Sequence, residues 1–191
     1  MEYFKFNNNL KPEKGSLLIS EPFLPDPNFE RTVVMICEHN EDGSFGFVLN
    51  KIAAVALEDI IEGMEGFEQE VFIGGPVQQD TLHFLHRSEI LQGGTEIVEG
   101  LYWGGDFDQL MSMIDTRQID PADFKFFVGY SGWGSGQLEE ELSINSWIVA
   151  RQATPDLVFD EKEDVLWKTV LKRLGGRFSV YSNYPIDPRL N

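Results

Sequence analysis

The segment of this chain with the clearest potential for chemistry is glycine-rich and runs over Gly129–Leu138 as GYSGWGSGQL. A glycine-rich turn between a strand and a helix commonly binds phosphate groups. A Walker A loop, however, needs Lys and then Ser or Thr where Ser135 and Gly136 stand, and a dinucleotide fingerprint needs glycine at Gln137. Trp133 also replaces the final glycine of the G-x-S-x-G nucleophile elbow. The segment therefore signals neither a nucleotide cofactor nor a serine nucleophile.

Electrostatics also oppose a bound anion at this segment. Glu139, Glu140 and Glu141 follow it, and it contains no Lys or Arg. Each carboxylate at about 7 Å would oppose a negative charge by roughly 0.6–2.4 kcal/mol, for an effective dielectric of about 80 down to about 20. One interpretation is structural: the glycines allow tight turns around packed aromatic rings, and the glutamates cap the next helix. The other is a surface that binds a protein or small ligand, with the candidate residues Tyr130, Ser131, Gly132, Trp133, Gly134, Ser135, Gly136 and Gln137.

Histidine and cysteine offer little further chemistry. His83 and His86 are three residues apart, so on a strand they point to opposite faces and could not share a metal. His39 lies in the acidic run Glu38–Asp42, which could hold a divalent cation loosely or form a solvated hairpin loop. Cys37 follows an apolar run, so we expect a buried thiol rather than a nucleophile paired with His39. We expect no catalytic residue, no metal site and no cofactor.

The charge of the chain limits its partners. The 191 residues carry a net charge of −17, with 9 basic against 29 acidic residues in positions 1–161 and 6 against 3 in positions 162–191. Direct nucleic-acid binding normally needs a basic stripe, and only Lys168, Lys172, Arg173 and Arg177 come close to one. The single cysteine excludes a disulfide within the chain. No apolar run is long enough for a membrane helix or a secretory signal, so we expect a cytoplasmic protein without membrane contact.

Periodicity predicts elements that would position these residues. We expect a loose lead-in over 1–14 and a single domain over 15–191. A proline-rich loop at Glu21–Arg31 offers Pro22 and Arg31 as further candidate contacts for a partner. Strands are predicted at Ser16–Ser20, Thr32–Cys37 (buried on both faces), Phe45–Asn50 after a turn at Asp42-Gly43, Val71–Ile73, Leu82–His86, Thr95–Val98, Phe124–Tyr130 and Trp147–Arg151.

Helices are predicted from the spacing of apolar residues. They fall on Leu57, Ile60, Ile61 and Met64; on Phe107, Leu110, Met111 and Ile114; on Trp167, Val170, Leu171 and Leu174; and on a short stretch from about Gln137. In the strand at Phe124–Tyr130, the alternation places Phe124, Phe126, Val128 and Tyr130 on one face. Helices and strands interleave without a regular β-α-β repeat, which favours an α+β (α/β-like) fold with a mixed sheet.

Several separated motifs together resemble the YqgE/AlgH family. They are Gly15–Ser20 with Pro22 and Pro25, Phe29-x-Arg31-Thr32-Val33, His39, Gly43–Lys51, Gly74-Gly75-Pro76-Val77, GYSGWGSGQLEEEL, and Pro155-Asp156-x-Val158-Phe159 ahead of Leu166-Trp167. The resemblance runs from about Gly15 to Gly176. It implies a bacterial cytoplasmic protein with a mixed β-sheet folded into a pseudo-barrel and flanked by helices. Members are often labelled transcriptional regulators, but the family offers no established catalytic residue to place on this sequence.

Three functional hypotheses follow from the sequence. The first is a non-enzymatic binding or regulatory protein that acts through a protein or small-molecule partner near Gly129–Leu138 and the loop Glu21–Arg31. The second is a metal-dependent hydrolase that uses His39 and nearby carboxylates. The third is a DNA-binding transcriptional regulator, against which the acidic surface argues.

Overall fold

The computed structural model describes residues 10–64, 67, 69–151 and 153–185 of the chain. The strands are β1 (Leu17–Ser20), β2 (Val33–Asn40), β3 (Gly43–Val48), β4 (Ile52–Ala56), β5 (Glu70–Ile73), β6 (Val77–His86), β7 (Thr95–Val98), β8 (Leu101–Trp103), β9 (Phe124–Gly134) and β10 (Trp147–Ala150). The α-helices are α1 (Phe107–Asp115), α2 (Gln137–Ser143), α3 (Pro155–Phe159), α4 (Glu163–Leu174) and α5 (Gly176–Tyr181). Single 3₁₀ turns lie at Leu57–Asp59 and Pro121–Asp123. None of the helices in these ranges has the length and apolarity needed to cross a bilayer.

The strands form one mixed sheet. Its order is β10-β1-β2-β3-β9-β6-β8-β7, with β5 beside β9 and β4 beside β5. The β5–β9 pair is parallel and the other pairs are antiparallel, which confirms the predicted α+β class. The sheet curls so that the residues before β1 reach β7: Lys14 donates from Nζ to the Glu96 carbonyl at 2.9 Å. No ladder joins β10 to β7 among the described residues, so the pseudo-barrel is not closed.

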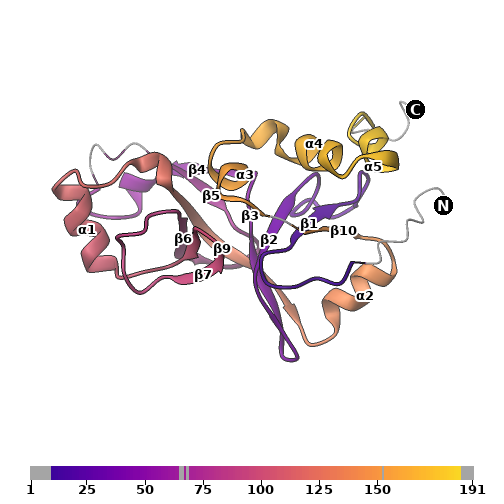
Figure 1. The fold of residues 1–191 in the computed structure, drawn as a ribbon, viewed down its shortest axis with the longest axis horizontal. Coiled ribbons are helices and arrows are strands. Elements are labelled where there is room, and N and C mark those ends of the chain that lie inside the picture. Colours follow the sequence, from indigo (N-terminus) through magenta and orange to yellow (C-terminus); the bar gives the residue numbers. More distant parts are fainter. Residues whose placement is uncertain (1–9, 65–66, 68, 152, 186–191) are drawn as a thin grey trace.

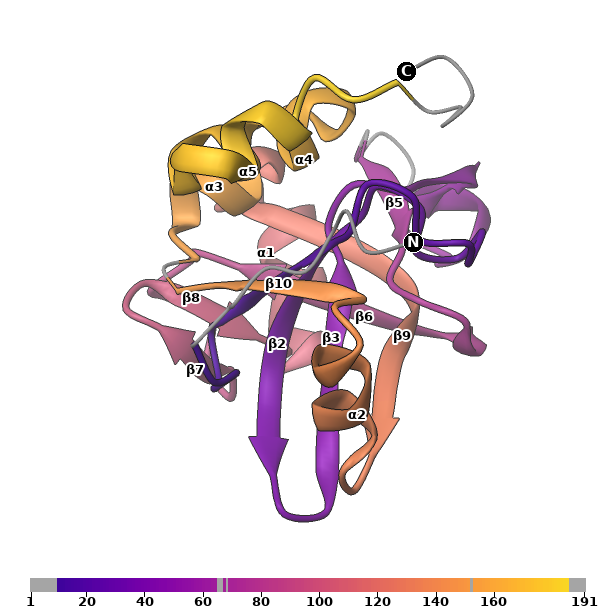
Figure 2. The same ribbon diagram turned by 90° about the vertical axis from the view of Figure 1, so that its right-hand side faces the viewer.

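Apolar residues on both faces of the central strands explain the layers. In β2, Val33, Met35 and Cys37 pack into one core cluster, while Val34 and Ile36 pack into another. This confirms the prediction that the strand is buried on both faces. Helix α4 covers the first cluster, and α2 covers the second. Figures 1 and 2 show α3, α4 and α5 together on one side of the sheet and α2 on another, while α1 covers a third cluster on the far arm.

The predicted helix at Leu57–Met64 is wrong. Only the 3₁₀ turn at Leu57–Asp59 forms there. Leu57 and Met64 are both fully buried, so the apolar spacing predicted the burial of these two residues correctly. Ile60, however, is 38% exposed, and Gly63 adopts a φ of +89°, which is incompatible with a continuous helix. The short strands β4 and β8 and the helices α3 and α5 were not predicted. Helix α4 ends at Leu174, and Gly175 follows it with a φ of +70°.

Strand β9 differs from the prediction in length and in the face that Tyr130 occupies. The strand continues to Gly134, so the first half of the glycine-rich segment lies within the sheet rather than in a turn. Gly129 has a φ of +65°, and the register of β9 against β6 shifts between Val128 and Tyr130. This irregularity reverses the alternation. Tyr130 therefore leaves the face of Phe124 and Phe126 and joins Phe127 on the opposite one, contrary to the predicted single face.

Candidate functional site

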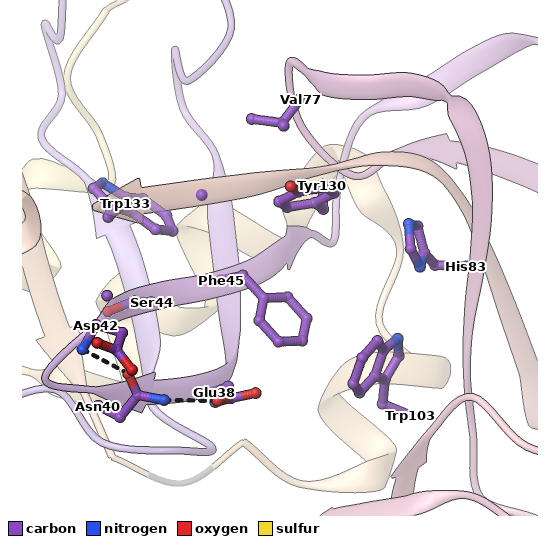
Figure 3. Close-up of a pocket in the computed structure, with 12 residues that line it drawn as sticks. Glu38, Asn40, Asp42, Ser44, Phe45, Val77, His83, Trp103, Tyr130 and Trp133 are labelled. Atoms are coloured by element: carbon purple, nitrogen blue, oxygen red, sulfur yellow. Dashed lines mark hydrogen bonds between the residues drawn. The ribbon is translucent and has the colours of Figure 1, made fainter. Parts of the chain in front are cut away.

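A pocket of about 660 Å³ opens where the β2–β3 hairpin meets β9, β6 and β8 (Figure 3). Its lining combines aromatic walls with a polar rim: Glu38, Asn40, Asp42, Gly43, Ser44, Phe45, Val77, His83, Trp103, Tyr130, Gly132 and Trp133. The volume lies within the range of small-ligand sites in proteins. We take this pocket as the candidate site.

Four half-buried rings form the walls, and we call Phe45, His83, Trp103 and Tyr130 the aromatic quartet. Phe45 lies 4.8 Å from Trp103 and 6.2 Å from Tyr130, measured between ring centroids. His83 lies 6.5 Å from Trp103 and 6.0 Å from Tyr130. Each ring comes from a different strand, β3, β6, β8 or β9, and Figure 3 shows the four arranged around one space.

Glycine at position 132 keeps this space open. Gly132 pairs directly with Phe45 across β3 and β9, and a Cβ added to it would lie 3.2 Å from Cε2 of Tyr130. The left-handed backbone of Gly129 then directs Tyr130 to the same side as Phe45. Two glycines of the segment that was predicted as a binding surface therefore shape the pocket, although neither contributes a side chain.

The rim of the pocket is polar and acidic. Glu38 and Asn40 extend from the end of β2 and Asp42 from the hairpin turn, and all three are exposed. Asn40 Nδ2 donates to Glu38 Oε1 at 2.7 Å, while the backbone N–H of Asp42 donates to Asn40 Oδ1 at 2.9 Å. Among the residues that the structure describes, neither Lys nor Arg lines the pocket. Its electrostatic character is therefore negative.

His83 contributes a neutral ring to the walls. Burial lowers the pKa of its imidazole below the usual 6.5, and its Nε2 lies 3.0 Å from the Thr81 hydroxyl. The His83 ring therefore adds no positive charge to the pocket at neutral pH.

The structure separates the residues of the predicted binding segment. Tyr130, Gly132 and Trp133 line the pocket. Ser131 is fully buried and donates from Oγ to the Gly74 carbonyl at 2.9 Å. The remaining residues lie outside the lining and form the turn into α2: Gly134, Ser135, Gly136 and Gln137.

Contacts in this turn are internal to the protein. Ser135 Oγ donates to the Glu41 carbonyl at 2.7 Å, and Gln137 Oε1 accepts from the Gly134 N–H at 3.0 Å. The turn therefore fastens the tip of the β2–β3 hairpin to the start of α2. This agrees with the structural interpretation of the glycines.

Pro22 and Arg31 lie away from the pocket. Pro22 is buried in the proline-rich loop. The guanidinium of Arg31 donates to the carbonyls of Tyr184 and Pro185, both at 2.6 Å, and lies 4.8 Å from the ring centre of Trp167. Burial lowers the pKa of Arg31. In this structure Arg31 anchors the residues after α5 to the loop before β2.

The His39 region holds a pair of polar groups but no metal cluster. His39 Nδ1 lies 2.7 Å from Ser44 Oγ, directly across the hairpin, and Nε2 lies 3.8 Å from Glu139 Oε1. Cys37 is 2% exposed, and desolvation raises the pKa of its thiol, as expected for a core residue. Within the ranges that the structure describes, no three His, Cys, Asp or Glu side chains gather as metal ligands.

Sequence reasoning missed most of the pocket walls. Phe45, Val77, His83 and Trp103 come from three strands that are distant from Gly129–Leu138 in sequence. The available signal was the GSFGF run, in which Phe45 stands next to Gly46, a residue whose added Cβ would collide with the Met35 carbonyl of the neighbouring strand. Trp103 lies in a three-residue strand too short to be predicted from periodicity.

Comparison with known proteins assigns the family. The AlgH-like family model matches residues 17–179. This chain belongs to the AlgH-like family. It is 48% identical over 180 residues to a UPF0301 protein of Cytophaga hutchinsonii, covering 93% of this chain and 98% of that one. It is 43% identical over 182 residues to a UPF0301 protein of Chlorobium phaeobacteroides, covering 95% and 97% of the two chains.

Solved structures show the same AlgH-like fold. The solution structure of the AlgH protein from Pseudomonas aeruginosa matches with a TM-score of 0.71 and 30% identity, over 92% of this chain and 98% of that one. A crystal structure of a Corynebacterium diphtheriae protein matches with a TM-score of 0.78 and 23% identity, over 95% and 100% of the two chains. The resemblance to the YqgE/AlgH family is thus confirmed, while the relatives' names carry no activity to transfer.

Proposed function

We propose that this AlgH-like protein is a binding protein that recognises its ligand in the pocket between the β2–β3 hairpin and β9. The observation that carries the proposal is the aromatic quartet. Its four rings come from four strands of the sheet, yet each is only half-buried because it faces the pocket. Large rings around an open space are typical of ligand sites, in which apolar walls supply affinity and a few polar groups supply orientation.

We further propose that the protein acts as a regulator in the cytoplasm. The net charge of −17 repels the DNA backbone, so we expect regulation to act through a small ligand or a protein side chain rather than through direct DNA contact. Gel-shift measurements at low salt test this expectation. A protein–DNA complex whose affinity falls steeply with salt would contradict it.

The test of the proposal uses matched variants of neighbouring residues. In Trp103→Ala one wall of the pocket is lost, whereas Tyr102→Ala removes a ring that lies outside the pocket lining and stacks on His86 at 5.3 Å. Two-dimensional NMR spectra would be recorded with small aromatic and aliphatic probes of positive, zero and negative charge. We expect at least one class of probe to shift the amide signals of residues 38–45 and 130–133. These shifts should be lost in Trp103→Ala and retained in Tyr102→Ala. The proposal fails if no probe produces shifts at the pocket.

An acyl hydrolase is the second candidate, favoured by the 2.7 Å separation of Ser44 Oγ and His39 Nδ1 next to Glu139. Such a contact resembles a nucleophile with its general base. Residues that face each other across a hairpin also form such bonds for structural reasons. A fluorophosphonate probe separates the two roles. Labelling of Ser44 in the wild type that is lost in His39→Ala would support the acyl hydrolase. Absence of Ser44 labelling in the wild type would contradict it.

A further inference from the structure

The chemistry of the pocket points to one class of ligand. The faces of aromatic rings carry partial negative charge, so a cation above several faces is attracted to each of them. In the aromatic quartet, Phe45 is inclined at 63° to Trp103 and at 81° to Tyr130, and His83 at 84° to Tyr130. These rings meet edge to face, and His83 is tilted by 36° against Trp103, so none of these pairs is stacked. Figure 3 shows the four rings around one space.

Formal charge at the pocket has the same sign as the ring faces. Glu38 and Asp42 belong to the lining, and no Lys or Arg of the described part of the chain does. Figure 3 places the Glu38 carboxylate at the edge of the space, beside Phe45. Asn40 Nδ2 donates a 2.7 Å hydrogen bond to that carboxylate.

Alternative ligand classes fit these groups less well. An anion would meet two carboxylates without a cationic partner. A divalent metal ion needs several convergent oxygen ligands, and the described residues contain no cluster of three or more acidic, His or Cys side chains. A bare ammonium ion is strongly hydrated, and aromatic walls cannot replace its hydrogen bonds to water. A methylated ammonium carries the same charge with apolar methyl groups against the rings, and such groups are recognised by aromatic cages in general.

We propose that the pocket binds a methylated ammonium group, with the aromatic quartet around the methyl groups and Glu38 opposite the charge. This inference rests on the proposed function, because it names the ligand class of the same pocket. The group can belong to a free small molecule or to a methylated lysine side chain of a protein, since the chemistry presented to the pocket is identical.

The deciding experiment compares choline with 3,3-dimethyl-1-butanol, its uncharged carbon isostere, by NMR titration of the full chain. Both probes fill the same volume, so only the charge differs. We expect choline to bind at least about tenfold more tightly, which corresponds to roughly 1.4 kcal/mol and is within the range for a cation among aromatic rings. Equal or tighter binding of the neutral isostere overturns the inference but leaves the pocket as a ligand site. Absence of shifts with every probe overturns the proposed function as well.

Variants test the assignment of the groups. Phe45→Leu and Trp103→Leu keep an apolar wall but remove a ring face, and each is expected to weaken choline binding about fivefold or more. Glu38→Gln keeps the hydrogen-bond acceptor for Asn40, loses the charge, and should weaken choline binding without affecting the neutral probe. Tyr102 lies on β8 beside Trp103 but outside the pocket lining, so Tyr102→Leu should leave choline binding unchanged. Unchanged choline affinity in all three pocket variants contradicts the proposal.

A further arm identifies the source of the group. Short peptides that contain trimethyllysine or unmodified lysine are titrated beside choline. Tighter binding of the trimethyllysine peptide than of choline supports a protein side chain, while equal binding supports a free small molecule. Preference for unmodified lysine over trimethyllysine would contradict recognition of the methylated group.

Discussion

The indole nitrogen of Trp133 donates a 2.9 Å hydrogen bond to Oε2 of Glu141, eight residues further along the chain. Trp147 Nε1 donates to the same oxygen at 2.7 Å, and the other carboxylate oxygen of Glu141 accepts from Gln137 at 3.1 Å. Glu141 is thus the acceptor that joins β9, α2 and β10. The third glutamate of the acidic run has a structural role that its neighbours Glu139 and Glu140 do not share.

Replacing Glu141 is expected to destabilise the protein. In Glu141→Ala both indole N–H groups lose their acceptor in a region where Trp133 is 5% and Trp147 1% exposed. Each unpaired buried donor costs about 1–3 kcal/mol, so for the two donors we expect a loss of roughly 2–6 kcal/mol in the free energy of unfolding. Urea denaturation followed by tryptophan fluorescence measures this loss.

The neighbouring Glu140 provides the control. Its side chain is exposed on the same helix, so Glu140→Ala should change stability by less than about 0.5 kcal/mol. Similar losses in both variants would show that helix α2, rather than the shared hydrogen bonds, determines the effect. The same contacts make Trp133 a poor position for testing ligand binding, because its removal would also damage the core.

Glycines of the predicted binding segment should differ in their tolerance of a side chain. Gly129 has a φ of +65°, and an added Cβ would lie 2.7 Å from the Val77 carbonyl, whereas Gly134 has no atom within 4 Å of such a Cβ. We expect Gly129→Ala to lower stability by roughly 2 kcal/mol or more and Gly134→Ala to be nearly neutral. Thermal unfolding should show Tm lower by several degrees for the first variant only. Equal Tm values would contradict the strained backbone at Gly129.

Stability at alkaline pH should reflect Lys125. This side chain is 6% exposed, with Nζ 4.0 Å from the ring centre of Phe72 and 3.3 Å from the Val158 carbonyl. Desolvation lowers its pKa to about 8, against 10.5 as the usual value. Between these pH values the unfolded chain holds a proton that the folded chain has released, so stability rises with pH, by up to about 3 kcal/mol in total.

The comparison with Lys125→Met isolates this effect. Urea denaturation between pH 7.5 and 10 should show wild-type stability rising relative to the variant, because other titrating groups such as the Cys37 thiol are common to both. Lys168→Met, at an exposed position of α4, should show a constant difference from wild type. A constant difference for Lys125→Met as well would mean that the amine is not desolvated.

Acid should destabilise the fold through His86. Its ring is fully buried between Tyr102 and Phe124, and desolvation lowers its pKa below 6.5. A base whose pKa is lower in the folded state resists protonation while the unfolded chain accepts it, so stability is lost as pH falls below about 6.5. NMR titration of the imidazole C–H signals should give a midpoint below 6.5 for His86. A midpoint at or above that value would contradict the burial argument.

Sequence patterns predicted the elements with strong hydrophobic patterns. They failed where the local backbone geometry determines the face that a side chain occupies. Strand β2 was predicted from its continuous apolar run, and helix α4 was predicted because its apolar residues repeat at helical spacing. The face of Tyr130 depends on the left-handed Gly129 and a register shift in the partner strand, which alternation alone does not encode. The candidate pocket was only partly predictable for a related reason. Its walls at His83 and Trp103 meet Tyr130 only through long-range pairing of β6, β8 and β9.

Strand β9 also sets the order in which the chain can fold during translation. It pairs with β3, β5 and β6, all of which are synthesised earlier. Until the ribosome has released residues 124–134, each of these strands presents an edge whose partner does not yet exist. The pairings that join β3, β5 and β6 into one sheet through β9 must therefore wait for the late part of synthesis, with the slow kinetics of non-local pairing. Fragments that stop before Phe124 expose three strand edges and are expected to aggregate or be degraded.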